Sequence, residues 1–251
     1  WGGAPGATND DWGHAASRMT AAEAAFYMGI PNLFLIRHKG RPQLEEYDQY
    51  AIALSPLKRV VWAVVESGGE TDPERRDYVL KMPARFPNIS GFIMDDYFKG
   101  DGTAHLTVDQ LRGLQQRRRT ADGRTLPLYV VVYSHQLHLP IQDHLKYCDK
   151  ITFWTWKSED LAKLPENFER LEKITPDHPK LLGCYLWDFG NKAPMPLERM
   201  KAQTLYGYRL LQEGRIEGMI FLEHGVCDIG LDTVDWTRSW LNEVGEQRLA
   251  R

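Results

Sequence analysis

Two adjacent carboxylic acids end an apolar run near the middle of the chain. Residues 91–98 read GFIMDDYF, so Asp95 and Asp96 directly follow a segment apolar enough to be a buried strand. Carboxylic acids that share a pocket can divide into a proton donor and an ionised base or nucleophile, because crowding separates their pKa values. Neighbours on a regular strand face opposite ways, so only one of the two can point inward. We expect the inward-facing residue to be Asp95, which lies on the same face of the strand as Gly91 and Ile93. Asp96 could still reach the pocket if the strand ends at Asp95.

Three further acids stand at the ends of other apolar runs. They are Glu66, Asp188 and Glu223. With Asp95 or Asp96 as the general acid, Asp188 is the preferred nucleophile or base. We expect Glu223 to be its substitute and Glu66 to help through hydrogen bonds.

Aromatic residues gather at the same positions along the chain. The candidates are Tyr97, Tyr133, Trp154, Trp156 and Trp187. Flat apolar rings stack on the C–H faces of sugars, while their polar edges donate hydrogen bonds. Some of these rings are expected to pack in the core, but Trp154 and Trp156 share parity and should face the same side.

Histidines and cations also follow the apolar runs. We expect Arg37, His38, His135 and His224 to bind substrate or to orient a carboxylate. No HxH or HExxH spacing is present, so we expect neither a metal ion nor another cofactor. Four lysines each follow a run by a few residues, and they predict either a rim selective for anionic glycans or a solvated surface; they are Lys39, Lys99, Lys157 and Lys192.

Seven β-rich runs position these residues. They span residues 33–36, 60–65, 91–94, 128–133, 151–154, 182–187 and 219–222. Between them, capping boxes begin at Thr20 and Thr107, and a helical repeat runs from Pro196 to Gly214. Alternating strands and helices predict an α/β fold, a (β/α)8 TIM-type barrel formed by residues 1–251 as a single domain, with its first strand short or truncated. An open doubly wound sheet is the alternative, although the chain lacks its glycine fingerprint.

Composition narrows the classes of partner. The 251 residues include 31 basic and 34 acidic side chains, so the protein has no strong positive electrostatic field that would attract nucleic acid. No apolar run is long enough to span a membrane, and three scattered cysteines do not indicate a disulfide framework. Because the chain starts with Trp1, we slightly favour a secreted or periplasmic protein over a cytoplasmic one.

Four segments resemble the (β/α)8-barrel glycoside hydrolases and their relatives: GFIMDDYF, ITFWTW, GCYLWDFG and GMIFLEHG. The resemblance implies that acids at strand ends flank the scissile bond and that aromatic residues line the sugar subsites. We therefore expect a carbohydrate-active hydrolase that acts on an oligosaccharide or polysaccharide. The alternatives are a glycan-binding barrel without catalysis and a Schiff-base lyase or aldolase that uses Lys157.

Overall fold

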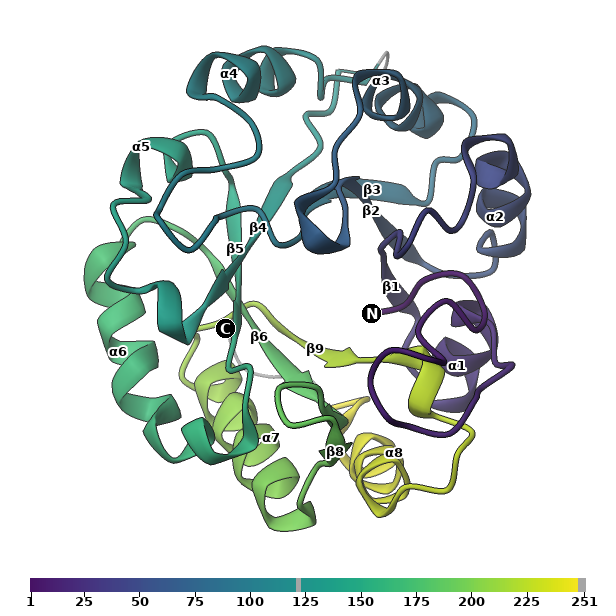
Figure 1. Cartoon of the computed structure of the whole chain (residues 1–251), viewed down its shortest axis with the longest axis vertical. Helices are drawn as coiled ribbons and strands as arrows, with labels where there is room; N and C mark the ends of the chain where they lie inside the picture. The colour runs from purple at the N-terminus through teal and green to yellow at the C-terminus, as the bar shows by residue number, and fades with distance from the viewer. Residues whose placement is uncertain (121–122, 248–251) are drawn as a thin grey trace.

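Seven parallel strands form one curled sheet in the computed structural model, which describes residues 1–120 and 123–247 (Figure 1). The strand order along the sheet is β1-β2-β3-β4-β5-β6-β9. These strands are β1 Asn32–Leu35, β2 Arg59–Val65, β3 Ile89–Met94, β4 Leu128–Tyr133, β5 Lys150–Trp154, β6 Lys180–Tyr185 and β9 Gly218–Leu222. All seven predicted runs are strands, which confirms the barrel class expected from their alternation with helices.

Within the described residues, eight α-helices surround this sheet (Figure 1). They are α1 Ala21–Tyr27, α2 Tyr47–Ala53, α3 Pro73–Lys81, α4 Val108–Gln116, α5 Gln142–Leu145, α6 Leu164–Ile174, α7 Leu197–Gln212 and α8 Asp232–Val244. Both predicted capping boxes are formed, at Thr20 with Glu23 and at Thr107 with Gln110. None of the described helices is both long and apolar enough to cross a bilayer.

The first residues of the chain fill the gap between β9 and β1. The Trp1 nitrogen donates to the Phe221 carbonyl at 3.0 Å, and the His224 nitrogen donates to the Trp1 carbonyl at 3.2 Å. On the other side, Gly2 pairs with β1 through hydrogen bonds with Phe34 and Ile36. Residues 1–2 therefore take the place of the short first strand that the sequence predicts, and they bring the Trp1 side chain to the mouth of the barrel.

Two strand ends differ from the expected geometry. β3 stops at Met94, and Asp96 then takes a left-handed φ of 44°, so the backbone turns directly after Asp95. β6 stops at Tyr185, and β7 (Trp187–Asp188) leaves the barrel to pair antiparallel with β8 (Ala193–Pro194). The first turn lets both Asp95 and Asp96 face the mouth, whereas the second carries Asp188 away from the barrel strand expected to present it.

Candidate active site

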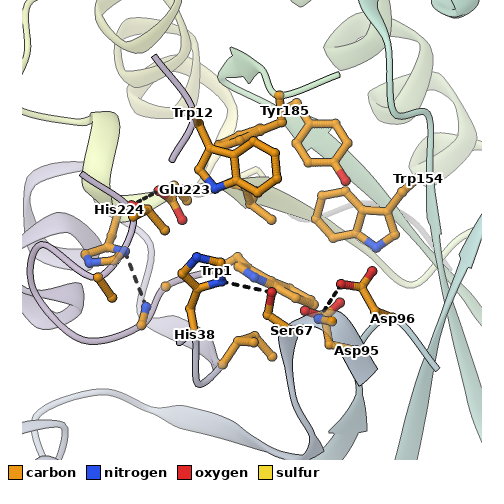
Figure 2. A pocket seen from close by; sticks show the side chains of 18 of the residues that line it. Trp1, Trp12, His38, Ser67, Asp95, Asp96, Trp154, Tyr185, Glu223 and His224 are labelled. Carbon is orange, nitrogen blue, oxygen red and sulfur yellow. Dashed lines mark hydrogen bonds between the residues drawn. The ribbon is translucent and has the colours of Figure 1, made fainter. Parts of the chain in front are cut away.

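A cavity of about 310 Å³ opens at the carboxyl ends of the barrel strands. Side chains at the ends of β4, β5, β6 and β9, and directly after β3, meet there with residues of the N-terminal segment (Figure 2). Asp95 and Asp96 lie on its wall, and Glu223 lies on the other side (Figure 2). The carboxyl ends of a barrel are where chemistry is normally carried, so this cavity is the candidate active site.

Asp95 is buried, with 7% of its surface exposed. Burial raises its pKa well above the ordinary value, and the nearby charges of Asp96 and Glu66 raise it further. Asp96, by contrast, accepts two hydrogen bonds, from the Tyr133 hydroxyl at 2.7 Å and from the Gly68 backbone nitrogen at 2.7 Å. The pair therefore contains an acid that holds its proton and a neighbouring carboxylate that serves as an acceptor.

Glu66 lies buried outside the cavity lining. Its carboxyl accepts a hydrogen bond from the Arg37 backbone nitrogen at 2.8 Å, and burial raises its pKa to about 7. The Arg37 guanidinium pairs with Glu70 at 2.8 Å. Both predicted substrate-binding residues, Glu66 and Arg37, thus lie outside the cavity wall, and Glu66 acts on Asp95 through its charge.

Glu223 follows β9 and is held from the N-terminal segment. It accepts a hydrogen bond from the Thr8 hydroxyl at 2.6 Å, and the His14 Nε2 atom lies 3.9 Å from the same oxygen. The neighbouring His224 accepts a bond from the Gly3 nitrogen at 3.3 Å, and burial lowers its pKa. Both Glu223 and His224 line the cavity, so the segment that closes the barrel also fixes this acid.

A chain of hydrogen bonds runs from the cavity wall to Asp11. Ser67 Oγ lies 2.9 Å from His38 Nδ1, and His38 Nε2 lies 2.7 Å from the Asp11 carboxylate. Lys39 also pairs with Asp11. Burial alone would raise the pKa of Asp11, but hydrogen bonds from Lys39 and His38 lower it. His38 and Ser67 line the cavity, so Asp11 sets the orientation of the imidazole from behind.

Aromatic rings make up most of the remaining wall. Trp154, Trp156 and Tyr133 line the cavity, as the strand pattern predicts, and Trp1, Trp12, Tyr185 and Phe189 join them. Trp1 meets Trp154 edge to face with ring centroids 5.2 Å apart, and Trp12 meets Trp156 in the same way at 5.7 Å. Such a wall of mutually packed rings is suited to the apolar faces of sugars.

The Trp154 ring depends on a glycine in the adjacent strand. A Cβ atom on Gly183 would lie 2.1 Å from Trp154 Cδ2, far inside van der Waals contact. We expect Gly183→Ala to lower the free energy of unfolding by about 1–3 kcal/mol, the usual cost of overpacking, and to displace the indole that lines the cavity. Urea unfolding and tryptophan fluorescence would measure both effects. Gly218→Ala in β9 is the control, because its nearest neighbour would lie at an ordinary 3.4 Å; equal effects of the two substitutions would contradict the prediction.

Asp188, the preferred base in the sequence interpretation, is not brought into the cavity. Its carboxylate accepts hydrogen bonds from the backbone nitrogens of Ser158 at 3.3 Å and Asn191 at 3.1 Å, and from the Asn191 side chain at 2.9 Å. The strand that was expected to present it has already ended, so Asp188 stabilises the turn between β7 and β8. Glu223 is the remaining candidate for the base.

Three aromatic or histidine candidates also lie outside the cavity lining. Tyr97 is buried and donates to the Leu106 carbonyl at 3.1 Å. Trp187 donates to the Trp12 carbonyl at 2.9 Å, which holds the loop that carries Trp12. His135 stacks on Tyr133 with ring centroids 5.3 Å apart. Trp187 and His135 thus contact residues of the cavity wall, whereas Tyr97 forms its hydrogen bonds with residues outside the lining.

The four predicted rim lysines are not among the residues that line the cavity. Lys39 pairs with Asp11, and Lys192 lies 5.6 Å from the centre of the Trp12 ring. Lys99 and Lys157 are exposed. Within residues 1–120 and 123–247, no lysine or arginine lines the cavity, and no group of three or more His, Cys, Asp or Glu side chains is arranged to hold a metal ion.

Sequence reasoning missed several lining residues: Trp1, Thr8, Trp12, Ser67 and Tyr185. A usable signal was present for those in the N-terminal loop. For the other strands, the residues that follow the strand were assigned to the mouth of the barrel. If residues 1–2 are treated as the first strand, the same rule assigns the loop after them to the mouth, and Trp12 is the large aromatic residue of that loop. Tyr185 gave a weaker signal, since it lies inside the run 182–187, which was expected to continue to Trp187, whereas β6 ends at Tyr185.

No protein-family model matches the chain, and no curated protein matches it in sequence. Among solved structures, the second active domain of a thermostable chitinase from Pyrococcus furiosus has a TM-score of 0.60 at 15% identity, covering 99% of this chain and 97% of that one. A GH113 β-mannanase from Alicyclobacillus acidocaldarius has a TM-score of 0.54 at 11% identity, covering 96% and 94%. A family 17 glycoside hydrolase, a β-1,3-glucanosyltransferase from Rhizomucor miehei, has a TM-score of 0.53 at 10% identity, covering 80% and 79%. The fold is thus that of TIM-barrel glycoside hydrolases, while identities this low carry no residue roles.

Proposed function

We propose that the protein hydrolyses glycosidic bonds, with Asp95 as the general acid and Glu223 as the nucleophile or base. The observation that carries this proposal is the contrast between the two sides of one aromatic cavity. On one side, Asp95 holds a proton because burial and neighbouring charges raise its pKa. On the other side, the Glu223 carboxyl accepts a hydrogen bond and faces the same space.

In this mechanism the sugar stacks on the tryptophan rings and its glycosidic oxygen lies against Asp95. Asp95 transfers its proton to the leaving oxygen as the bond to the anomeric carbon breaks. Glu223 either attacks that carbon or removes a proton from the attacking water, as retaining and inverting enzymes respectively require. Asp96 stays hydrogen-bonded to Tyr133 and Gly68, and its negative charge helps to hold the proton on Asp95.

The geometry gives less support to the two other activities. A Schiff-base enzyme needs a desolvated lysine in the barrel, whereas Lys157 is exposed and outside the cavity lining. A barrel without catalysis would have its carboxylates splayed apart or tied up in ion pairs with Arg37 or Lys99. Arg37 instead pairs with Glu70, and Asp95 is free to face the cavity.

A screen of the protein against polysaccharides and oligosaccharides of neutral, acidic and amino sugars, with analysis of the products, tests the proposal. We expect new reducing ends from at least one glycan, and their loss in Glu223→Gln. Saturable glycan binding by a folded protein that releases no product from any member of the screen would favour the non-catalytic alternative.

A further inference from the structure

The cavity contains a third acid besides the proposed proton donor and base. Asp95 and Glu223 act as acid and base, and Asp96, whose charge acts on Asp95, also lines the cavity beside the loop that carries Ser67. No lysine or arginine from the described parts of the chain lines the cavity to offset this charge. An acid that faces a mostly aromatic cavity without a lysine or arginine beside it is an acceptor available to a ligand.

Ser67 provides a second acceptor beside Asp96. In the neutral His38 imidazole, the hydrogen bond to Asp11 places the ring proton on Nε2, so Nδ1 accepts the proton of the Ser67 hydroxyl. The lone pairs of Ser67 Oγ are then left for the cavity. The next residue, Gly68, donates its backbone nitrogen to Asp96 at 2.7 Å, which holds the serine and the carboxylate side by side (Figure 2).

Aromatic rings complete the surroundings of these two acceptors. Trp1, Trp154 and Tyr133 all line the cavity, and Tyr133 donates directly to Asp96. The faces of tryptophan and tyrosine rings attract cations, and more strongly where water is excluded. The same wall would repel a carboxylate or a sulfate, since it offers them negative charge and no lysine or arginine.

We propose that this corner of the cavity binds a protonated amine, held between Asp96 and Ser67, and that the glycan substrate carries an amino sugar with a free amine. The inference rests on the proposed function only in taking the ligand to be a sugar. It replaces the anionic glycan that the positions of the lysines suggested, because those lysines lie outside the cavity lining.

Binding of matched sugars to the Asp95→Asn variant tests the inference without turnover, and asparagine preserves the neutral state of this acid. The probes are glucose, glucosamine and N-acetylglucosamine, the galactose counterparts, and linear β-linked oligomers of the glucose series, measured by isothermal titration calorimetry at low salt. We expect at least one amine-bearing sugar to bind about tenfold or more tightly than its hydroxyl and N-acetyl counterparts, as a charge-assisted hydrogen bond implies. Added salt should reduce the ratio.

Two further substitutions in the Asp95→Asn background locate the subsite. Asp96→Asn and Ser67→Ala should each bring the ratio of amine to hydroxyl binding close to one. Asp143→Asn removes an exposed carboxylate that pairs with Lys146 outside the cavity lining, so it should leave the ratio unchanged. Asparagine tolerates the left-handed φ of residue 96, and Ser67→Ala keeps the test valid if the other variant does not fold.

The inference is overturned if no amine-bearing sugar binds more tightly than its counterparts, including the case in which none binds, or if both substitutions leave the ratio unchanged. Failure of the proposed function has a separate sign. If the protein binds amines through Asp96 yet hydrolyses no glycan, the amine subsite stands and the proposed hydrolase activity is wrong. If it hydrolyses a neutral glycan and shows no preference for amines, the activity stands and the amine subsite is wrong.

Discussion

Asp95→Asn is expected to lower kcat by about 10²–10⁴-fold on the glycan that the screen identifies, the range that general acid catalysis contributes. Asparagine has the shape of the neutral acid but no proton to give to the leaving oxygen. Binding should be nearly unchanged, because the side chain that it replaces is itself neutral when buried beside Asp96. Steady-state kinetics should therefore show a loss in kcat with little change in KM.

The pH dependence of the same pair of proteins gives a second readout. A general acid must be protonated, so wild-type activity should persist at neutral pH and decline as the pH rises through the raised pKa of Asp95. The basic limb of the profile should disappear in Asp95→Asn. An aryl glycoside whose leaving group needs no proton should lose much less activity in the variant than the natural glycan does.

Asp188→Asn is the matched control, since it removes a buried carboxylate outside the cavity lining. It weakens the turn that holds Ser158 and Asn191, so a lower free energy of unfolding is expected, with kcat and the basic limb retained. A fall in kcat for Asp188→Asn as large as that for Asp95→Asn, in a folded protein, would assign the chemistry to both acids. Wild-type kcat in Asp95→Asn would remove Asp95 from the mechanism.

The barrel could be predicted because each of its strands is an apolar run followed by polar residues. Local composition is enough to show that pattern, and Asp95, Glu223 and Trp154 reach the cavity from strand ends identified in this way. Asp188 follows an equally apolar run, but β6 ends at Tyr185 and the chain turns into a small antiparallel pair. That turn depends on Asp188 itself and on contacts with Ser158, thirty residues away, so no local pattern indicates it.

Contacts distant in sequence also explain the missed residues. Thr8 reaches Glu223 across 215 positions, and His38 connects Ser67 with Asp11 across two loops. A single loop gives no sign of such a partner. The lysines show the reverse error: position after a strand puts a residue near the mouth, but a long charged side chain turns toward solvent or a nearby acid, as Lys39 does toward Asp11.

Glu66→Gln should stabilise the protein at alkaline pH and leave it nearly unchanged under acidic conditions. The pKa of Glu66 is raised to about 7 in the folded protein by burial, whereas an unfolded chain ionises it near the ordinary glutamate pKa of 4.5. Between these values the folded state binds more protons than the unfolded state, so the wild-type free energy of unfolding falls as the pH rises. The difference in pKa corresponds to about 3 kcal/mol, fully present below pH ~4.5 and lost above pH ~7. Glutamine does not ionise, and its carbonyl can still accept from the Arg37 nitrogen.

Urea unfolding of both proteins at several pH values across this window measures the effect. The gap between the two free energies of unfolding should open as the pH rises and approach about 3 kcal/mol at pH ~8, plus whatever Asp95 gains when its charged neighbour is removed. Glu70→Gln is the control, because this neighbouring acid is largely exposed and its substitution should give a gap that does not vary with pH in the same way. Parallel pH curves for wild type and Glu66→Gln would contradict the prediction, because they would show that Glu66 ionises at the same pH in the folded and unfolded chains.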